Sequence, residues 1–149
     1  MSTSSQSAAK VIQPYLFFNG SCEQAIEFYK TALGAELQML MRYKESPDPA
    51  PPGMVPDGWG EKIMHASLKV GELALMMSDG CDAECRGFSG FSLSLTMPTQ
   101  AEAERAFAAL ADGGKITLAI TKTFWSPCFG MLQDRFGVGW MVSVPSVPS

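Results

Sequence analysis

The chain has 149 residues, of which 46% are apolar and 17% are charged, a composition typical of globular domains. Eleven Lys and Arg against 15 Asp and Glu give a formal net charge of -4, and no segment concentrates basic residues, so we expect no nucleic acid partner. No window reaches the roughly 18 apolar residues of a membrane span, and the N-terminal residues lack the pattern of a secretion signal. The composition predicts a single cytoplasmic domain over 1–149 with no membrane partner.

Four cysteines are present, and their irregular spacing does not resemble a secreted disulfide scaffold, so we expect free thiols. Cys81 and Cys85 form an isolated C-x3-C pair, which is a weak zinc signal. Cys22 lies at the expected start of a helix, where the helix dipole is expected to lower its pKa. Cys22 is therefore predicted to be a redox-sensitive thiol.

The first half of the chain begins with a predicted strand, 11–18 (VIQPYLFF), which Asn19-Gly20 interrupts. A helix follows, because Ser21 and Gln24 have the spacing of a capping box and Gly34 ends the pattern. Its apolar face consists of Ala25, Phe28, Tyr29, Ala32 and Leu33. Three extended segments come next: Glu36–Tyr43, Lys62–Val70 and Glu72–Asp79.

The second half repeats this order. Adding 78 to the residue numbers turns the first strand into 89–96 and the capping box into Thr99 and Glu102. The extended segments after the second helix are Ile116–Phe124, Phe129–Asp134 and Val138–Val144. The sequence therefore predicts two internal modules, about 11–79 and 89–144, each with the order strand, helix, strand, strand, strand.

Two segments lie outside this repeat. Residues 45–60 form an insert with five prolines and three glycines, which disfavour a strand or helix. We expect the insert to cover the mouth of a ligand cavity or to contact a dimer partner, with Trp59 as its apolar anchor; a plain solvated loop is the alternative. Residues 145–149 are a short tail.

Three sequence strings resemble the PhnB-like branch of the vicinal oxygen chelate (glyoxalase/bleomycin resistance/extradiol dioxygenase) superfamily: PYLFFNGSCEQAIEFYKTALGA, KIMHASLKVGELALMMSDG and FWSPCFGMLQDRFGVGW. The resemblance implies an α+β fold in which two tandem βαβββ modules form a cupped mixed sheet with helices outside. It also implies a ligand cavity in the cup and a homodimer. The methyltransferase label sometimes given to this branch finds no support, since no G-x-G turn opens either helix.

The metal enzymes of that superfamily take ligands from the first and last strands of each half. The resemblance places these positions at Pro14, Ser92, Met141 and either Leu75 or Met77, none of which is an ordinary metal ligand. Independently, the chain has one histidine, whereas a facial triad needs two. We therefore expect no metal and no cofactor, and a metal-dependent lyase or dioxygenase remains an alternative.

The candidate ligand site follows from strand alternation. Met64, Ala66 and Leu68 are uniformly apolar and are expected to pack under a helix, which turns His65 and Ser67 towards the cup. The candidates for ligand contact inside the cup are His65, Ser67, Leu16, Phe18, Ser92, Ser94, Met141 and Ser143. Trp125 and Trp59 are rim candidates at loop edges.

Other side chains of the site have a structural interpretation beside the functional one. His65 is either a half-buried imidazole held by a neighbouring hydrogen bond or a ligand contact. Asp134 is expected to satisfy turn amides, and Trp140 to lie in the core. No catalytic residue is assigned, so whether the protein is an enzyme stays open.

The function predicted from these residues is binding of a small, partly apolar ligand in the cup without a metal, by a homodimer. The alternatives are a metal-dependent lyase or dioxygenase and a resistance protein that sequesters a toxin or antibiotic.

Overall fold

The computed structural model describes residues 11–46, 58–80 and 87–145. The first unit contains β1 (Tyr15–Phe17), α2 (Cys22–Leu33), β2 (Glu36–Arg42), β3 (Ile63–Val70) and β4 (Leu73–Ser78). Short 3-10 helices, η1 (Tyr43–Glu45) and η2 (Trp59–Glu61), stand between β2 and β3. The second unit contains β5 (Leu93–Thr96), α3 (Gln100–Ala111), β6 (Lys115–Thr121), β7 (Phe129–Gln133) and β8 (Gly139–Ser143). The predicted order of elements is confirmed in both units.

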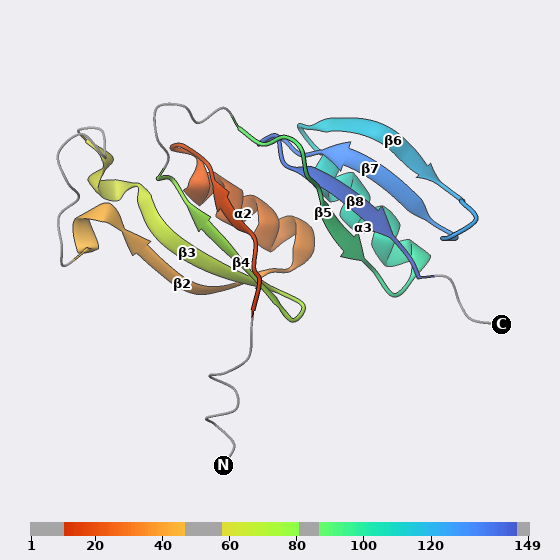
Figure 1. The fold of residues 1–149 in the computed structure, drawn as a ribbon, viewed down its shortest axis with the longest axis horizontal. Coiled ribbons are helices and arrows are strands. Elements are labelled where there is room, and N and C mark those ends of the chain that lie inside the picture. The colour runs from red at the N-terminus through yellow and green to blue at the C-terminus, as the bar shows by residue number, and fades with distance from the viewer. Residues whose placement is uncertain (1–10, 47–57, 81–86, 146–149) are drawn as a thin grey trace, which may run out of the picture.

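Each unit forms a four-stranded mixed sheet, with strand orders β1-β4-β3-β2 and β5-β8-β7-β6. The first strand of each unit runs parallel to the last, and the other pairs are antiparallel. The two sheets lie side by side with β1 and β5 towards the middle (Figure 1). The α+β prediction is confirmed, with two separate sheets in place of one continuous sheet.

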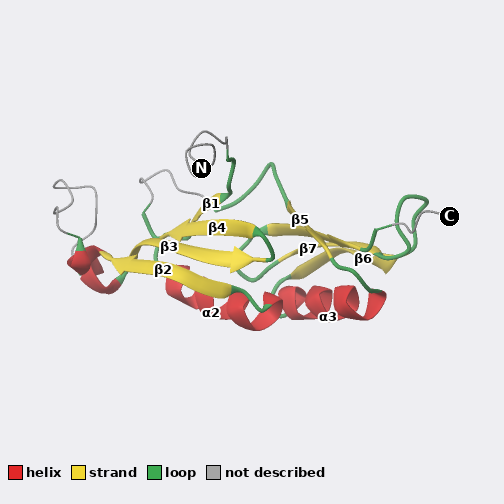
Figure 2. Ribbon diagram, turned by 90° about the horizontal axis from the view of Figure 1, so that it is seen from below, coloured by secondary structure: helices red, strands yellow, loops and turns green. Residues whose placement is uncertain are grey.

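Both helices cover the same side of the two sheets (Figure 2). We call the opposite side, over which the structure places no helix among the described residues, the open face. It corresponds to the inside of the predicted cup. Neither helix of the described ranges is long and apolar enough to cross a membrane.

The hydrophobic core lies between the sheets and the helices. Alternate strand residues turn inward, so Leu68, Leu75 and Met77 are buried beneath α2 together with Ile26. In the second unit, an added Cβ at Gly130 would meet the Phe107 ring of α3 at 2.6 Å. The buried cluster contains residues of both units.

Asp134, in the turn between β7 and β8, joins the two units. One carboxylate oxygen accepts hydrogen bonds from the backbone amides of Phe136 and Val138, as predicted for a turn aspartate. The other accepts from the Tyr29 hydroxyl at 2.5 Å and from the Trp140 indole at 2.9 Å, and neither of these partners was predicted. Burial and the adjacent Asp134 carboxylate raise the pKa of Tyr29 far above its ordinary value.

The two helices begin differently. Thr99 caps α3, since its side chain accepts a hydrogen bond from the Glu102 amide at 3.2 Å, as predicted. The capping prediction for Ser21 was wrong, because its hydroxyl donates to the Phe18 carbonyl. Asp79, which follows β4, takes the place of Ser21: its carboxylate accepts from the amides of Gly20 at 2.7 Å and Cys22 at 2.8 Å.

The environment of Cys22 contradicts the prediction of a redox-sensitive thiol. Its side chain is fully buried, and burial together with the neighbouring Asp79 carboxylate raises the pKa of the Cys22 thiol. These two effects on the Cys22 pKa outweigh the lowering expected from the helix dipole. Cys22 and Cys128 are both free and buried, whereas Cys81 and Cys85 lie outside the described residues.

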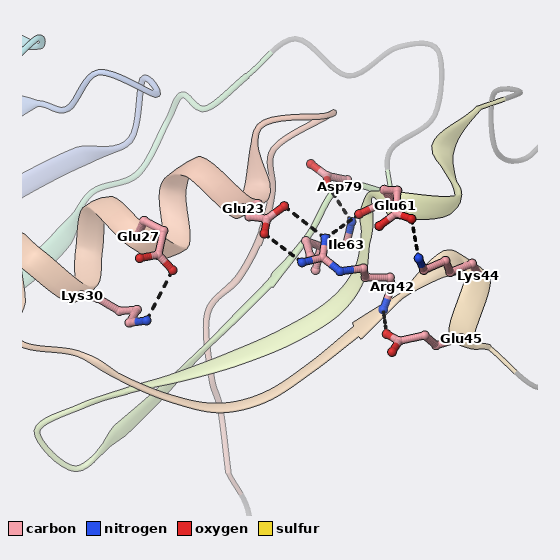
Figure 3. Close-up of polar contacts among 9 residues, drawn as sticks. All are labelled: Glu23, Glu27, Lys30, Arg42, Lys44, Glu45, Glu61, Ile63 and Asp79. Atoms are coloured by element: carbon pink, nitrogen blue, oxygen red, sulfur yellow. Dashed lines mark hydrogen bonds and ion pairs between the residues drawn. The ribbon is translucent and has the colours of Figure 1, made fainter.

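Ion pairs connect the two ends of the proline-rich insert to each other and to α2 (Figure 3). Arg42 donates to the Glu23 carboxylate at 2.8 and 3.1 Å and to the Glu61 carbonyl at 2.6 Å. Lys44 pairs with the Glu61 side chain, and the Arg42 hydrogen bond lowers the pKa of Glu23. Residues 47–57 of the insert lie outside the described residues, so the role of the insert as a lid or dimer contact stays a prediction.

Candidate functional site

His65 and Ser67 lie half-buried on the open face of the first sheet, while Ala66 and Leu68 between and beyond them are fully buried under α2. The strand register sets their neighbours. Ser67 lies opposite Met39 of β2 and Met76 of β4, and His65 lies opposite Met41. Methionine residues therefore lie beside both His65 and Ser67 in the sheet.

Tyr15 of β1 reaches His65. Its hydroxyl oxygen lies 2.8 Å from the His65 Nδ1, and this contact is exposed to solvent. The Tyr15 ring also stacks on Phe17, with ring centroids 4.8 Å apart. Burial, and to a smaller extent Tyr43, raise the pKa of Tyr15, so the phenol is protonated at neutral pH. Tyr15 was not among the site residues predicted from the sequence.

The prediction that Leu16 and Phe18 face the cup was wrong. Leu16 is 3% exposed and Phe18 7% exposed, and both belong to the core. Phe18 packs against Tyr29, whose ring centroid is 6.5 Å away. The side chains of β1 on the open face are instead Tyr15 and Phe17, which are 39% and 43% exposed.

One extra turn residue explains this reversal. The Phe18 amide donates a hydrogen bond to the carbonyl of Ser78, the last residue of β4. The Met97 amide donates in the same way to the carbonyl of Ser143, the last residue of β8, and both distances are 2.8 Å. Phe18 and Met97 are thus structurally equivalent, but Ser21 follows three positions after the first and Thr99 only two after the second. The offset of 78 aligns the helices but shifts the strands by one residue, and a shift of one residue exchanges the two faces of a strand.

The second sheet carries the remaining candidates. Ser94 lies opposite Met141 in the β5–β8 register, and Ser143 lies opposite Phe129 of β7. Ser92 is exposed immediately before β5. The structure therefore divides the predicted site between two sheets, with His65 and Ser67 on the first and these serines and Met141 on the second.

The two tryptophan candidates occupy different places. Trp125, 51% exposed, packs edge to face on Phe129 at 5.4 Å and on Phe124 at 4.7 Å. Trp59 begins η2, and its ring lies 6.4 Å from Tyr43 and against the Gly20 turn. The described contacts place Trp59 near the N-terminus of α2, apart from Trp125.

A groove of ≈ 480 Å³ lies between β1 and β5, lined by residues that include Gln13, Tyr15, Leu73 and Phe91. A larger hollow of ≈ 710 Å³ lies on the opposite side, against the helices, where charged residues such as Glu23 and Arg135 line it. The first groove adjoins the residue that contacts His65 and is the one relevant to the candidate site.

The positions that the family resemblance relates to metal ligands do not fit a metal ion. Leu75 and Met77 are buried on the helix side, and Pro14 and Met141 offer no strong donor. Within 11–46, 58–80 and 87–145 there is no group of three or more His, Cys, Asp or Glu side chains suited to a metal ion.

Two successive βαβββ units with both helices on one side define a protein of glyoxalase-like fold, and this chain is of the PhnB-like kind. Residues 10–143 match the sequence model of the family described as 3-demethylubiquinone-9 3-methyltransferase, and the chain belongs to that family.

Named relatives share almost the whole chain. Protein YjdN of Escherichia coli (strain K12) is 39% identical over 141 residues, covering 89% of this chain and 94% of its own. Protein PA1353 from Pseudomonas aeruginosa is 45% identical, with a TM-score of 0.81 over 92% of this chain and 98% of its own. A PhnB protein from Bacillus cereus is 26% identical, with a TM-score of 0.73 over 91% of this chain and 99% of its own.

Proposed function

We propose that this protein is a cytoplasmic homodimer that binds a small, partly apolar molecule on the open face of its first sheet without a metal ion. The observation that carries the proposal is the exposed hydrogen bond between Tyr15 and His65, set among methionine and aromatic side chains. A few polar groups on a mostly apolar surface are the usual composition of a small-molecule site.

Two features of the open face support binding there. Tyr15 and Phe17 expose large apolar surfaces on a strand whose alternate residues are buried. The methionines beside Ser67 are unbranched and adapt to ligands of different shape. Methyl transfer, which the family description names, is not part of the proposal, because neither helix begins at the G-x-G turn of Rossmann methyltransferases.

The test is NMR of protein labelled with 13C at the methionine methyl groups, titrated with naphthol as a neutral aromatic probe. We expect the signals of Met39, Met41 and Met76 to shift in a saturable way, while the signal of the buried Met77 on the helix side stays nearly unchanged. EDTA is expected to change neither the titration nor the melting temperature, because removing a metal bound only to the folded state would lower the latter.

The proposal is contradicted if naphthol leaves the three open-face signals in place, or shifts all methionine signals equally. A loss of binding in EDTA that zinc or manganese restores would contradict its metal-free part. The Met76→Leu variant identifies the Met76 signal, because it is expected to retain the fold and to lack that one methyl signal.

A further inference from the structure

We infer that Tyr15 and His65 act together as the polar recognition element of the open-face site, and that its ligands are neutral aromatic molecules bearing one hydroxyl or carbonyl group. The inference rests on the proposed function and adds a ligand class and the role of two residues. Four observations carry it: the geometry of the pair, its hydrogen-bonding capacity, the charges around it and the apolar surface beside it.

The pair leaves one ring nitrogen of His65 for a ligand. Tyr15 engages Nδ1 at 2.8 Å, and Nε2 has no hydrogen-bond partner in the part of the chain that the structure describes. The contact is exposed, and the imidazole is only half-buried. A ligand on the open face therefore has access to an imidazole that a neighbouring phenol already orients.

A phenol hydroxyl both donates and accepts, which makes the pair adaptable. When Tyr15 donates to Nδ1, Nε2 carries the proton and donates to a ligand carbonyl. When Nδ1 carries the proton and donates to Tyr15, Nε2 accepts from a ligand hydroxyl. Both arrangements fit the same distance between heavy atoms, so the pair suits either group without moving.

The charges of the first unit favour a neutral ligand over an anion. Arg42 is bound to Glu23, and Lys62 donates to the Gly20 carbonyl at 2.8 Å. Lys69, further along β3, lies directly opposite Glu36 in the strand register. Arg42 and Lys62 are held by these partners, and the charge of Lys69 is offset by the neighbouring Glu36, whereas a neutral hydroxyl or carbonyl needs no cation beside His65.

The surface beside the pair favours a flat ligand. The rings of Tyr15 and Phe17 are nearly parallel, with an interplanar angle of 10°, and both are partly exposed. Met76 lies opposite Tyr15 in the β1–β4 register and extends this apolar surface towards β3. An aromatic ring packed here buries apolar area while its polar group meets His65.

The experiment compares three naphthalene derivatives on the wild-type protein. Naphthol and methylnaphthalene have nearly the same shape and differ in the hydroxyl, and naphthalenesulfonate carries a charge. His65 is the single histidine of the chain, so its imidazole NMR signals are assigned without mutagenesis. We expect naphthol to bind about three- to tenfold more tightly than methylnaphthalene, as one net hydrogen bond allows, and to shift the His65 signals.

Variants test the two residues separately. His65→Phe keeps an aromatic ring, and Tyr15→Phe keeps the stack on Phe17; each is expected to remove the preference for naphthol while methylnaphthalene binds as before. The control is Thr31→Ala, which removes a hydroxyl on the exposed side of α2 and is expected to keep the preference. Chemical shifts of the wild-type imidazole remain a readout should a variant fail to fold.

The outcomes separate this inference from the proposed function. If no probe shifts the open-face methionine signals, the proposed function fails. If naphthol and methylnaphthalene bind equally and the His65 signals stay in place, the ligand class is wrong while the proposed function stands. Tighter binding of naphthalenesulfonate than of naphthol would overturn the inference in favour of an anion site.

Discussion

Two buried carboxylates hold the molecule together at the residue scale. Asp79 accepts three backbone amides, from Gly20, Cys22 and Ile63, and so joins β4 to the start of α2 and of β3. Asp134 accepts from Tyr29 and so joins α2 to the second unit. Hydrogen bonds to a charged acceptor are stronger than neutral ones, and a buried charge needs them.

The Tyr29→Phe substitution tests the connection through Asp134. Removing the hydroxyl takes one donor from a buried carboxylate, so we expect the free energy of unfolding to fall by about 1.5–3 kcal/mol in urea denaturation. Asp112→Asn is the matched control, because Asp112 is 80% exposed in its ion pair with Arg135 and its loss should cost less than about 1 kcal/mol. Equal effects of the two substitutions would contradict the role assigned to Asp134.

At the scale of elements, two helices of equal length begin with different caps. Thr99 caps α3 from within its own segment, whereas α2 depends on Asp79, which lies 57 residues after Cys22 in the chain. The first helix is therefore capped only once β4 is in place. The second carries its own start signal.

Alanine substitutions at the two caps should differ. Thr99→Ala is expected to lower the free energy of unfolding by about 0.5–2 kcal/mol. Ser21→Ala should cost less than about 0.5 kcal/mol, since the Ser21 hydroxyl contributes no cap bond. Urea denaturation of both variants measures the difference, and a larger loss at Ser21 would refute the assignment of the cap to Asp79.

At the scale of the whole molecule, large apolar side chains remain exposed. Phe124 and Trp125, between β6 and β7 of the second unit, are 95% and 51% exposed. Tyr15 and Phe17 are partly exposed on the open face of the first sheet. Exposed aromatic groups of this size are typical of surfaces that bind a partner. A second copy of the chain is the partner we predict.

Light scattering tests the homodimer. We expect a species of twice the 16.0 kDa chain mass at micromolar concentration, and a weaker association by at least about tenfold after Phe124→Asp, because a carboxylate is costly to bury unpaired. Thr31→Asp on the exposed side of α2 is the control and should leave association unchanged. A 16.0 kDa species alone for the wild type would refute the prediction.

The sequence by itself determined the elements of this protein and hence its fold. The order of strands and helices, Gly34 as a helix stop and Thr99 as a cap are local signals that the sequence predicted correctly, although β1 covers only Tyr15–Phe17 of the predicted 11–18. The positions of His65 and Ser67 on one side of β3 also followed from local alternation, because Ala66 and Leu68 had to be buried.

Tertiary structure alone decided what depends on distant residues. The extra residue in the turn before α2 set which side of β1 is exposed, and it replaced Leu16 by Tyr15 on the open face. Asp79 displaced Ser21 as a cap through bonds across the fold. Tyr15 and His65 are 50 positions apart, and no local pattern links them; only the pairing of β1, β4 and β3 brings them into contact.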